Sequence, residues 1–217
     1  MNRLEFLASL TEGSNSVLDI GSDHAYTVVY AVNKYHVSSA TAADINIGPL
    51  LNAKENIHSF KLENKIDTIL SDGFKNIERS YDTVVISGMG GKLIKDILEN
   101  GLSKKKNFKK FILQANSDKL VLREFLAKND FLITDEFLIK DNNKFYTVIE
   151  CTSGYMKLTS LELEFGPYLL RKKGPLFREM YLHKLHLLTK NLSKTKPSSR
   201  NLLSSKINKI REILELN

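Results

Sequence analysis

The stretch Asp19-Ile20-Gly21-Ser22-Asp23-His24-Ala25-Tyr26 (DIGSDHAY) joins two segments of different periodicity. Before it, Ser16–Ile20 (SVLDI) is a short apolar run stopped by Gly21, which is typical of a buried strand. After it, His24–Tyr35 repeats apolar residues at helical spacing. A buried strand, a glycine turn and a helix in this order predict the start of a βαβ unit, and therefore a parallel sheet.

Strands and helices continue to alternate as far as residue 153. Further strands are expected at Ala40–Ile45, Ile66–Leu70, Tyr81–Ser87, Phe108–Gln114, Phe131–Ile139 and Lys144–Thr152. Further helices are expected from Pro49 to Ile57, at Lys92–Asn100 and at Asp118–Lys128. The last two strands flank Asp141-Asn142-Asn143, a hairpin signal, so we expect them to be antiparallel edge strands. Residues 1–153 are thus predicted to form an α/β domain.

Residues 154–217 are predicted to form a second, wholly helical domain. Leu158–Arg171 is weakly helical, with a break at Gly166-Pro167. Two apolar stripes follow, each spaced four, three and four: Tyr181, Leu185, Leu188 and Leu192, then Leu203, Ile207, Ile210 and Leu214. Between them, Ser193–Asn201 supplies Pro197 as a helix breaker and Ser198 or Ser199 as a helix cap. We expect an antiparallel, coiled-coil-like hairpin; the alternative is that both helices pack flat on the α/β domain.

Positive charge is concentrated in the predicted helical domain. Residues 154–217 contain 13 basic and 5 acidic side chains, whereas residues 1–153 contain 19 and 20. A basic appendage on a neutral domain indicates a polyanionic partner, most often nucleic acid. AT-rich coding is the competing explanation, because 25 of the 32 basic residues are lysine. It does not explain why the excess lies in one part of the chain.

The composition excludes several classes of protein. The single cysteine, Cys151, rules out a disulfide framework or a multi-cysteine zinc site, and it fits a reducing compartment. No apolar run approaches the roughly 18 residues of a membrane span. The segment from Met1 to Gly13 lacks the basic start and apolar core of a signal peptide. We therefore expect a soluble, cytoplasmic protein without a metal. We also expect a monomer, because each apolar stripe covers less than two heptads and does not require an oligomeric coiled coil.

Acids and glycines gather at the predicted strand ends, where open parallel sheets bind their ligands. In chain order these residues are Asp19, Gly21, Ser22, Asp44, Asp72, Gly73 and Gly88. Gly21 allows close approach of a ligand to the backbone. Asp44, at the next strand end, suits a ribose diol, and Asp72 is placed for an adenine amino group. Each acid taken singly also fits a helix cap or a turn.

The first loop argues against a dinucleotide. Such a site needs G-x-G-x-x-G and a helix N-terminus that faces pyrophosphate, whereas Gly21-Ser22-Asp23 supplies one glycine and an acid that would repel phosphate. A P-loop motif is absent from the sequence. An acid at this position tolerates a positively charged ligand, and S-adenosylmethionine carries a sulfonium and an ammonium group. S-adenosylmethionine is therefore compatible with this loop.

Several motifs, in order along nearly the whole chain, resemble the bacterial TrmK family, the tRNA adenine-N1 methyltransferases that act on adenine 22. They are DIGSDHAY (Asp19 to Tyr26), Asp44, SDGF (Ser71 to Phe74), SGMGG (Ser87 to Gly91), LQAN (Leu113 to Asn116) and Gly166-Pro167 with Leu169 and Leu170. The resemblance implies a Rossmann-like class I methyltransferase domain, S-adenosylmethionine as cofactor, tRNA as partner and a C-terminal helical hairpin. Thr27-Val28 replaces the family's Leu-Pro, Ala115 replaces a proline, and the tail is shorter, which leaves details of the substrate cleft open.

The implied reaction assigns roles to four residues. Adenine N1 has a lone pair, so no general base is needed before it attacks the methyl group. Because the product is cationic, the enzyme has to position the base and stabilise developing positive charge. Asp23 is the first candidate for that carboxylate. Asn116, with Gln114 nearby, is expected to present an amide to the base edge. His24 is expected to open a helix, where it is either catalytic or only a structural donor.

The base must be extruded from the tRNA, and aromatic rings would help to hold it. Tyr26, Phe74 and Tyr146 are possible stacking platforms, with core packing as the alternative for each. Two basic clusters are expected to bind RNA phosphates: Lys104, Lys105 and Lys106, and Arg171, Lys172, Lys173 and Arg178. For the first cluster, in the 104–110 loop, a merely solvated surface is the alternative.

Three other functions remain open from the sequence. One is a dehydrogenase with a degenerate dinucleotide loop. The second is a methyltransferase of the same fold that acts on another RNA, a small molecule or a protein. The third is an RNA-binding protein without catalytic activity, which would bind no cofactor.

Overall fold

The computed structural model describes residues 1–192 and 196–216. In these residues one seven-stranded sheet has the order β3-β2-β1-β4-β5-β7-β6. The strands are β1 (Ser16–Ile20), β2 (Ser39–Asp44), β3 (Ile66–Leu70), β4 (Tyr81–Met89), β5 (Phe108–Ala115), β6 (Phe131–Asp141) and β7 (Lys144–Ser153). The pairs from β3 to β5 are all parallel, and β7 is antiparallel to both of its neighbours.

The predicted strands and the predicted hairpin are confirmed, with one correction. β7 is inserted between β5 and β6. Of the two hairpin strands, therefore, only β7 is antiparallel to the other strands and only β6 lies at an edge of the sheet. The hairpin turn uses Asn142 and Asn143, both with positive φ. Asparagine tolerates this left-handed conformation better than most residues, which is why the sequence signal was reliable.

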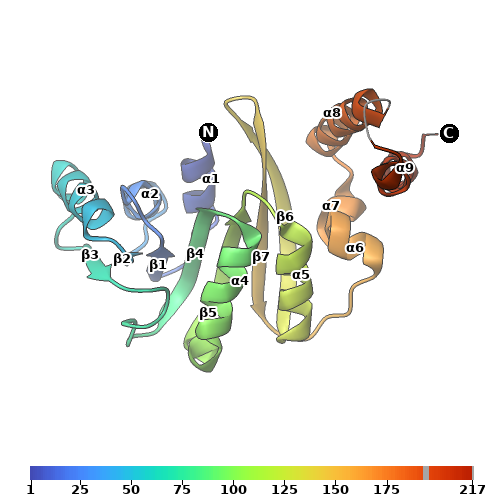
Figure 1. Ribbon diagram of the computed structural model, residues 1–217. Coiled ribbons are helices and arrows are strands. Elements are labelled where there is room, and N and C mark those ends of the chain that lie inside the picture. Colours follow the sequence, from blue (N-terminus) through green and yellow to red (C-terminus); the bar gives the residue numbers. More distant parts are fainter. Residues whose placement is uncertain (193–195, 217) are drawn as a thin grey trace.

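Helices cover both faces of the sheet (Figure 1). They are α1 (Arg3–Ser9), α2 (Tyr26–Lys34), α3 (Ile47–Ser59), α4 (Gly91–Asn100) and α5 (Lys119–Lys128), with a 3-10 turn, η1, at Leu102–Asn107. Successive residues of a strand pack on opposite faces of the sheet: Val84 and Ile86 belong to the core under α4 and α5, whereas Val85 belongs to the core under α1 to α3. This alternation follows from the two-residue period of a strand. Cys151 is fully buried in the first of these cores.

The sequence analysis did not predict α1. This helix has only seven residues, capped by Asn2, whose side chain accepts a hydrogen bond from the Glu5 backbone. Its Leu7 and Ala8 are fully buried in the core shared with α2. A helix this short is held by packing rather than by intrinsic propensity, so its periodicity is a weak signal.

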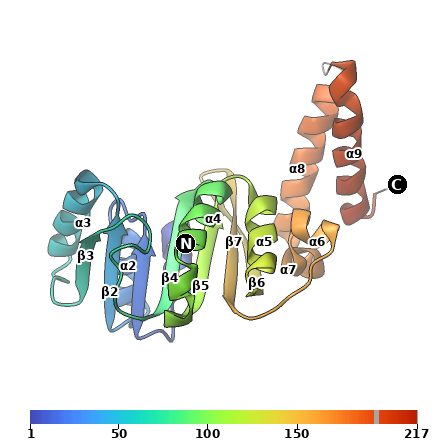
Figure 2. The same ribbon diagram turned by 60° about the horizontal axis from the view of Figure 1, so that its bottom comes forward.

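The C-terminal helices are α6 (Ser160–Phe165), α7 (Pro167–Lys172), α8 (Pro175–Leu192) and α9 (Pro197–Leu214). α8 and α9 lie side by side as a hairpin that projects from the α/β body (Figure 2). The hairpin prediction is confirmed; of the alternative, in which both helices pack onto the α/β domain, the main contact among the described residues is that of α8 with β6. Tyr181, Ile210 and Leu214 from the predicted stripes share a small core with Phe165 of α6.

The expected cap of the second hairpin helix is wrong. α9 begins at Pro197, with Lys196 at the N-cap, so Ser198 and Ser199 lie inside the first turn. Proline suits that first position because its missing N–H would have no partner there. Residues 193–195 of the predicted turn lie outside the described residues. Within the described ranges, no helix is long and apolar enough to cross a membrane.

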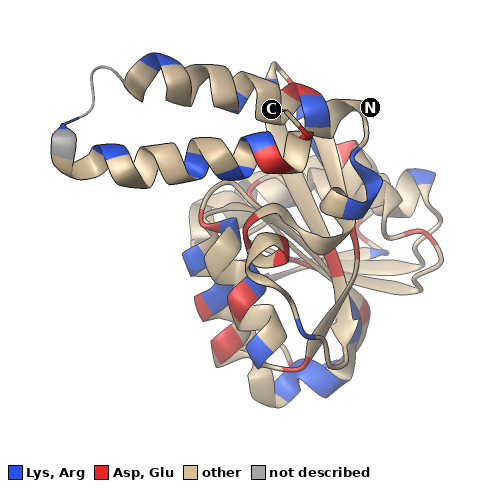
Figure 3. Cartoon of the chain, turned by 90° about the vertical axis from the view of Figure 1, so that its right-hand side faces the viewer, with Lys and Arg blue, Asp and Glu red and all other residues tan. Residues whose placement is uncertain are grey.

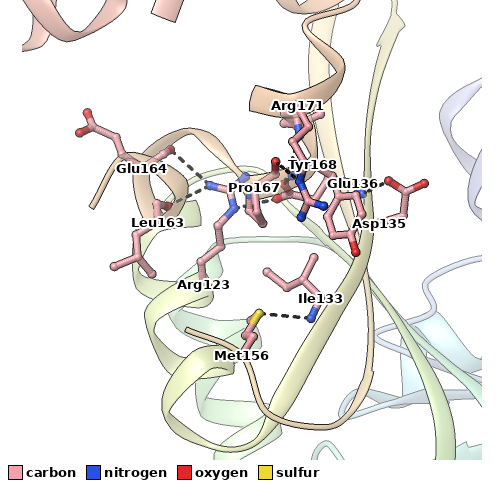
Figure 4. Close-up of polar contacts among 11 residues, drawn as sticks. Arg123, Ile133, Asp135, Glu136, Met156, Leu163, Glu164, Pro167, Tyr168 and Arg171 are labelled. Atoms are coloured by element: carbon pink, nitrogen blue, oxygen red, sulfur yellow. Dashed lines mark hydrogen bonds and ion pairs between the residues drawn. The ribbon is translucent and has the colours of Figure 1, made fainter. Parts of the chain in front are cut away.

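A buried ion pair joins the sheet to α6 and α7 (Figure 4). The Arg123 Nε of α5 donates to the Glu136 Oε1 of β6 at 2.8 Å, and both side chains are at most 1% exposed. Arg123 also donates to the carbonyl groups of Leu163 and Glu164, while Glu136 Oε2 accepts from the Tyr168 backbone N–H. Figure 4 shows these groups converging from α5, β6, α6 and α7, so this joint ties the C-terminal helices to the sheet.

Gly166 allows the chain between α6 and α7 to pack directly against the buried ion pair. Its φ of +96° is unfavourable for any other residue, and a Cβ there would lie 2.4 Å from Glu136 Oε2 and 2.8 Å from an Arg123 nitrogen. The break that the sequence showed at Gly166-Pro167 is therefore the contact point of the buried ion pair.

Candidate active site

A crevice lies where the strand order reverses, between the carboxyl ends of β1 and β4. Ile20 pairs with both Ala43 and Ile86, and the backbone N–H groups of Gly21 and Ser22 donate to the Ala43 carbonyl. The cavity holds about 350 Å³ and is lined by the loop after β1 and by residues 87–89 at the carboxyl end of β4. A larger hollow, of about 830 Å³, runs beside β3 near the start of that strand, away from these ends. We assign the site to the smaller cavity, because ligands of open parallel sheets bind at the carboxyl ends.

Gly21 is required for the shape of this crevice. Its φ is +78°, and a Cβ built there would lie 1.9 Å from Met89 Cε. The loop thus passes close to β4 with its backbone facing the cavity, as the sequence predicted for a close-approach glycine.

Asp19 and Ser22 are buried polar groups in the crevice wall. Both side chains are 4% exposed, and the Ser22 hydroxyl has no hydrogen-bond partner. Burial raises the pKa of Asp19 to about 6, while the adjacent Ser22 hydroxyl and, more weakly, the Arg3 guanidinium act in the opposite direction. Among the described residues, no basic side chain forms an ion pair with Asp19. A buried carboxylate and an unpartnered hydroxyl are expensive unless a bound group satisfies them.

Asp23 and His24 lie at the mouth of the same cavity. Their side chains are 64% and 48% exposed, and the Asp23 carboxylate is 3.4 Å from the His24 Nε2. His24 does not open α2 as predicted: the helix begins at Tyr26, and Ala25 is its N-cap, in a left-handed conformation and without a side-chain cap bond. Neither Asp23 nor His24 caps the helix.

Asp44 is the last residue of β2 and Asp72 follows the neighbouring strand β3; neither lines the cavity itself. Asp44 Oδ1 accepts a hydrogen bond from the Asn46 backbone at 2.8 Å, which leaves its second oxygen available. Asp72 is exposed, and Gly73 follows it with a φ of +56°. The Ser71 N–H donates to the Asp44 carbonyl, so these two acidic loops lie next to each other along the edge of the sheet.

Gly88, Gln114 and Asn116 form a connected group. The Asn116 Nδ2 donates to the Gly88 carbonyl at 2.7 Å, and the Gln114 Nε2 donates to the Asn116 Oδ1 at 3.0 Å. Gln114 is 0% exposed, and its Oε1 accepts from Gly88 N and from Arg3. Gln114, a candidate catalytic residue expected near the base edge, is therefore enclosed by these contacts. It orients the exposed Asn116, the residue expected to present its amide to the base.

Arg3 is a site residue that the sequence analysis missed. Its Nη1 donates to Gln114 Oε1 at 2.5 Å, and its backbone N–H donates to Asp141 Oδ2 at 3.1 Å. Its guanidinium also lies 5.4 Å from the centre of the Tyr146 ring. Arg3 belongs to the short helix α1, which carries no recognisable motif, so only the folded structure brings it to the site.

A second cavity, of about 630 Å³, adjoins the first. Arg3 and Gly88 line both cavities, and Asn116, Tyr146 and His183 line the second. The structure thus separates the predicted catalytic residues: Asp23 and His24 line the first cavity, whereas Asn116 lines the second. His183 comes from α8, a contribution that no local sequence pattern indicates.

Two of the three predicted aromatic platforms face these cavities. Tyr26 is 37% exposed and lines the first cavity, and Tyr146 lines the second. Phe74 is 3% exposed and packs against Phe108, with 5.2 Å between ring centroids. Phe74 is therefore a core residue, as the alternative in the sequence analysis held.

The first predicted RNA cluster lies at the wrong end of the sheet. Residues 104–106 precede β5, so they lie at its amino end, opposite the crevice. Lys104 Nζ donates to the carbonyls of Phe74, Lys75 and Ile77, and Lys105 Nζ donates to those of Asn129 and Asp130. These two ammonium groups hold loops together, which corrects their assignment as RNA ligands. Lys106 is exposed at the same end.

The second predicted RNA cluster also has partners within the protein. Lys172 binds Asp135 and the Glu136 carbonyl, and Lys173 pairs with Glu215 at 2.6 Å. Arg171 lies over the Tyr168 ring at 4.1 Å, whereas Arg178 is exposed. Exposed ion pairs of this kind still exchange readily, so these residues remain a prediction.

The fold and the site together define a Rossmann-like methyltransferase. The sheet is doubly wound, acids follow its first three strands, and the first loop has neither the glycines nor the charge for pyrophosphate. The family model of TrmK, "tRNA (adenine(22)-N(1))-methyltransferase", matches residues 17–214. The chain belongs to this family.

Relatives and solved structures agree with this assignment. A Bacillus subtilis tRNA (adenine(22)-N(1))-methyltransferase is 33% identical over 190 residues, which cover 84% of this chain and 80% of the relative. The structure of M. capricolum TrmK with S-adenosyl-homocysteine is 31% identical with a TM-score of 0.87, over 98% of this chain and 96% of that one. The B. subtilis TrmK structure is 29% identical with a TM-score of 0.82, over 97% of each chain. The family, fold class and enzyme class predicted from the sequence are confirmed.

Proposed function

We propose that this chain transfers a methyl group from S-adenosylmethionine to N1 of adenine 22 in tRNA, with the first cavity holding the cofactor. The observation that carries the proposal is the buried Asp19 carboxylate beside the unpartnered Ser22 hydroxyl. A ligand with an ammonium group fits both, because a cation stabilises a buried carboxylate. When bound, S-adenosylmethionine supplies an electrophilic methyl group on a positively charged sulfur.

The remaining cofactor residues follow the edge of the sheet. Gly21 and Gly88 border the cavity with backbone, Asp44 offers its free oxygen to the ribose hydroxyls, and Asp72-Gly73 flanks the adenine. This order follows the strand ends from β4 through β1 and β2 to β3. Acidic hydrogen-bond acceptors at these positions favour an uncharged sugar and a cationic amino acid over a pyrophosphate.

We assign the second cavity to the target adenine. Asn116 presents an amide at its wall, held in orientation by Gln114, and Tyr146 offers an aromatic face for stacking. N1 of adenine attacks with its own lone pair, so no residue needs to remove a proton first. Asp23, at the mouth of the adjoining cavity, stabilises the positive charge that develops on the base. His24 contacts Asp23 and orients its carboxylate.

A direct assay tests the proposed function. We expect the full-length protein to methylate in vitro transcribed tRNA with labelled S-adenosylmethionine, and digestion to yield 1-methyladenosine at position 22 only. A tRNA in which position 22 is guanosine is the matched control. Methylation at another position, or of a small molecule instead, would favour a methyltransferase of the same fold with another substrate. NAD binding without S-adenosylhomocysteine binding would favour the dehydrogenase alternative.

The pKa of Asp19 gives a prediction about stability. Because the folded-state pKa, about 6, exceeds the ordinary value of 3.8, the carboxyl stabilises the fold below about pH 4, and this contribution disappears as the pH rises through 6. At pH 8 the ionised group costs the ligand-free protein about 3 kcal/mol, at about 1.4 kcal/mol per pKa unit. Asp19→Asn is therefore expected to raise the free energy of unfolding by up to about 3 kcal/mol at pH 8, and by little near pH 4.

Urea unfolding at both pH values measures this effect, and calorimetry with S-adenosylhomocysteine measures the expected loss of affinity, tenfold or more. The exposed Asp96 provides a control: Asp96→Asn should change neither quantity appreciably. A stability gain for Asp19→Asn that is equal at both pH values would contradict the argument. So would unchanged cofactor affinity.

We further propose that the protein works in the cytoplasm as a monomer and without a metal. The short hairpin stripes are packed within one chain, which supports a monomer. In the described ranges no three His, Cys, Asp or Glu side chains gather in a possible metal site. We also propose residues 1–153 as the catalytic domain and residues 154–217 as the tRNA-binding domain. Arg171, Lys172, Lys173 and Arg178 stay RNA candidates in the second of these.

A further inference from the structure

A groove separates the start of α5 from the helical hairpin. It holds about 610 Å³, and its walls come from α5, α6, α8 and α9. Four lysines line it: Lys119 of α5, Lys184 of α8, and Lys206 and Lys209 of α9. Figure 3 shows basic residues at intervals along the two hairpin helices, which extend beside the α/β body. The four lysines are widely separated in the sequence, so no charge run marks this groove.

The acids near the groove do not neutralise it. Glu164 is paired with Lys209 at 2.6 Å. The other basic group in its wall, Arg123, is neutralised by the buried Glu136. Lys119, Lys184 and Lys206 form no ion pair with a described residue; the acids in the groove wall are Asp118, at the start of α5, and Glu164. The groove therefore carries a net positive charge.

The surroundings of Lys119 and Lys184 lower the pKa of both side chains. Burial lowers the pKa of Lys119, and Arg123 and Lys184 add to the effect. Burial also lowers the pKa of Lys184, with Lys206 acting in the same direction and Glu164 against it. Lys119, Lys184 and Lys206 are therefore held close together by the fold, in the wall of one groove. An anion placed between them would remove that repulsion.

The groove lies next to the cavity assigned to the target base, although no described residue lines both. The Lys119 Nζ donates to the carbonyl of Asn116 at 3.4 Å, and Asn116 lines that cavity. On α8, His183 lines the base cavity and the next residue, Lys184, lines the groove. A polyanion in the groove thus lies beside the proposed base pocket and contacts both the catalytic domain and the hairpin.

We propose that this lysine groove, defined by Lys119, Lys184 and Lys206, binds backbone phosphates of the tRNA strand next to the nucleotide that enters the base cavity. The inference rests on the proposed function and adds to it the path of the RNA. A polynucleotide fits because its phosphates recur along a strand, so that one chain can reach lysines on α5, α8 and α9 together. Such contacts position the substrate without reading its sequence.

The test compares the salt dependence of tRNA binding for matched variants. The double variant Lys119→Gln/Lys184→Gln removes two groove cations, whereas Lys54→Gln/Lys128→Gln removes two exposed lysines that do not line the groove. The dissociation constant for in vitro transcribed tRNA is measured at several salt concentrations, with S-adenosylhomocysteine present. Because each lost phosphate contact lowers the slope of log affinity against log salt by about one, the groove variant should lose about two. Its affinity at low salt should fall at least tenfold.

The control variant should keep the wild-type slope and affinity, and all variants should keep their affinity for S-adenosylhomocysteine. Lys206→Gln, on the other hairpin helix, should lose about one in slope, so the test does not depend on one double variant. A groove variant with the slope and affinity of the control would overturn the inference. Binding of an acidic protein segment in the groove, in place of tRNA, would overturn it as well. Binding is read without methyl transfer, so absence of 1-methyladenosine in the wild-type reaction would overturn the proposed function separately.

Discussion

Glu136→Gln is expected to lower the free energy of unfolding by about 3–5 kcal/mol, the usual cost of breaking a buried ion pair by removing one charge. Glutamine keeps the size of the side chain, but it leaves the Arg123 guanidinium buried without a counter-charge. It also weakens the acceptor for the backbone N–H groups of Tyr168 and Leu169, which fix the start of α7. Urea unfolding, followed by circular dichroism, measures the loss.

An exposed pair provides the matched control. Glu179 binds Lys140 at 2.6 Å with both side chains more than a third exposed, so Glu179→Gln should cost less than about 1 kcal/mol. Burial raises the pKa of Glu136, and Arg123 opposes that shift. We expect the pair to be ionised at neutral pH, since Arg123 and two backbone N–H groups stabilise the carboxylate. If Glu136→Gln cost no more than the control, Glu136 would have to be protonated in the native protein.

Asp23→Asn is expected to slow methyl transfer by about tenfold to a thousandfold, comparable to losing one preorganised electrostatic group. Asparagine keeps the size and one acceptor but removes the charge that favours the cationic product over the neutral base. The structure removes one competing role, because Asp23 does not cap α2. It also offers Asp19, which is buried, as the better partner for the cofactor's ammonium group.

Single-turnover rates at saturating S-adenosylmethionine, measured beside the cofactor dissociation constant, test this role. The rate should fall while the dissociation constant changes by less than about tenfold, or roughly 1.4 kcal/mol. Asp96→Asn, a neutralised acid on α4, should leave both values unchanged. A variant that loses cofactor affinity first, with a normal rate at saturation, would assign Asp23 to the cofactor instead.

The sequence predicted those parts of the fold that local patterns control. Buried strands such as Ser16–Ile20 are short apolar runs, and the apolar stripes of α8 and α9 repeat at helical spacing, so both could be read directly. The position of β7 between β5 and β6 could not, because it depends on which strand edges pair in three dimensions. The short helix α1 was missed because packing, and not its own sequence, stabilises it.

The distinction between local patterns and contacts of distant segments also explains which site residues could be predicted. Gly21, Asp44 and Asp72 follow strand ends, so the topology of a parallel sheet brings them together. The sequence does not indicate that Gln114 is enclosed by Arg3 and Gly88, since that depends on contacts between distant segments. Lys104 and Lys105 looked like a phosphate site because a run of lysines reads the same whether it faces solvent or binds carbonyl groups. Lys119, Lys184 and Lys206 gave no signal, because only the fold gathers them.

Cys151 has a practical consequence for experiments on this protein. It is the single cysteine of the chain, it is fully buried between strands, and burial raises the pKa of its thiol, so maleimide reagents should leave it unmodified in the native state. A cysteine introduced at an exposed position of the hairpin outside the lysine groove, such as Leu187→Cys, would then be the single reactive thiol. A fluorescent or spin label can therefore be attached there without first removing the native cysteine. Such a label would report changes in the surroundings of the hairpin when tRNA is added.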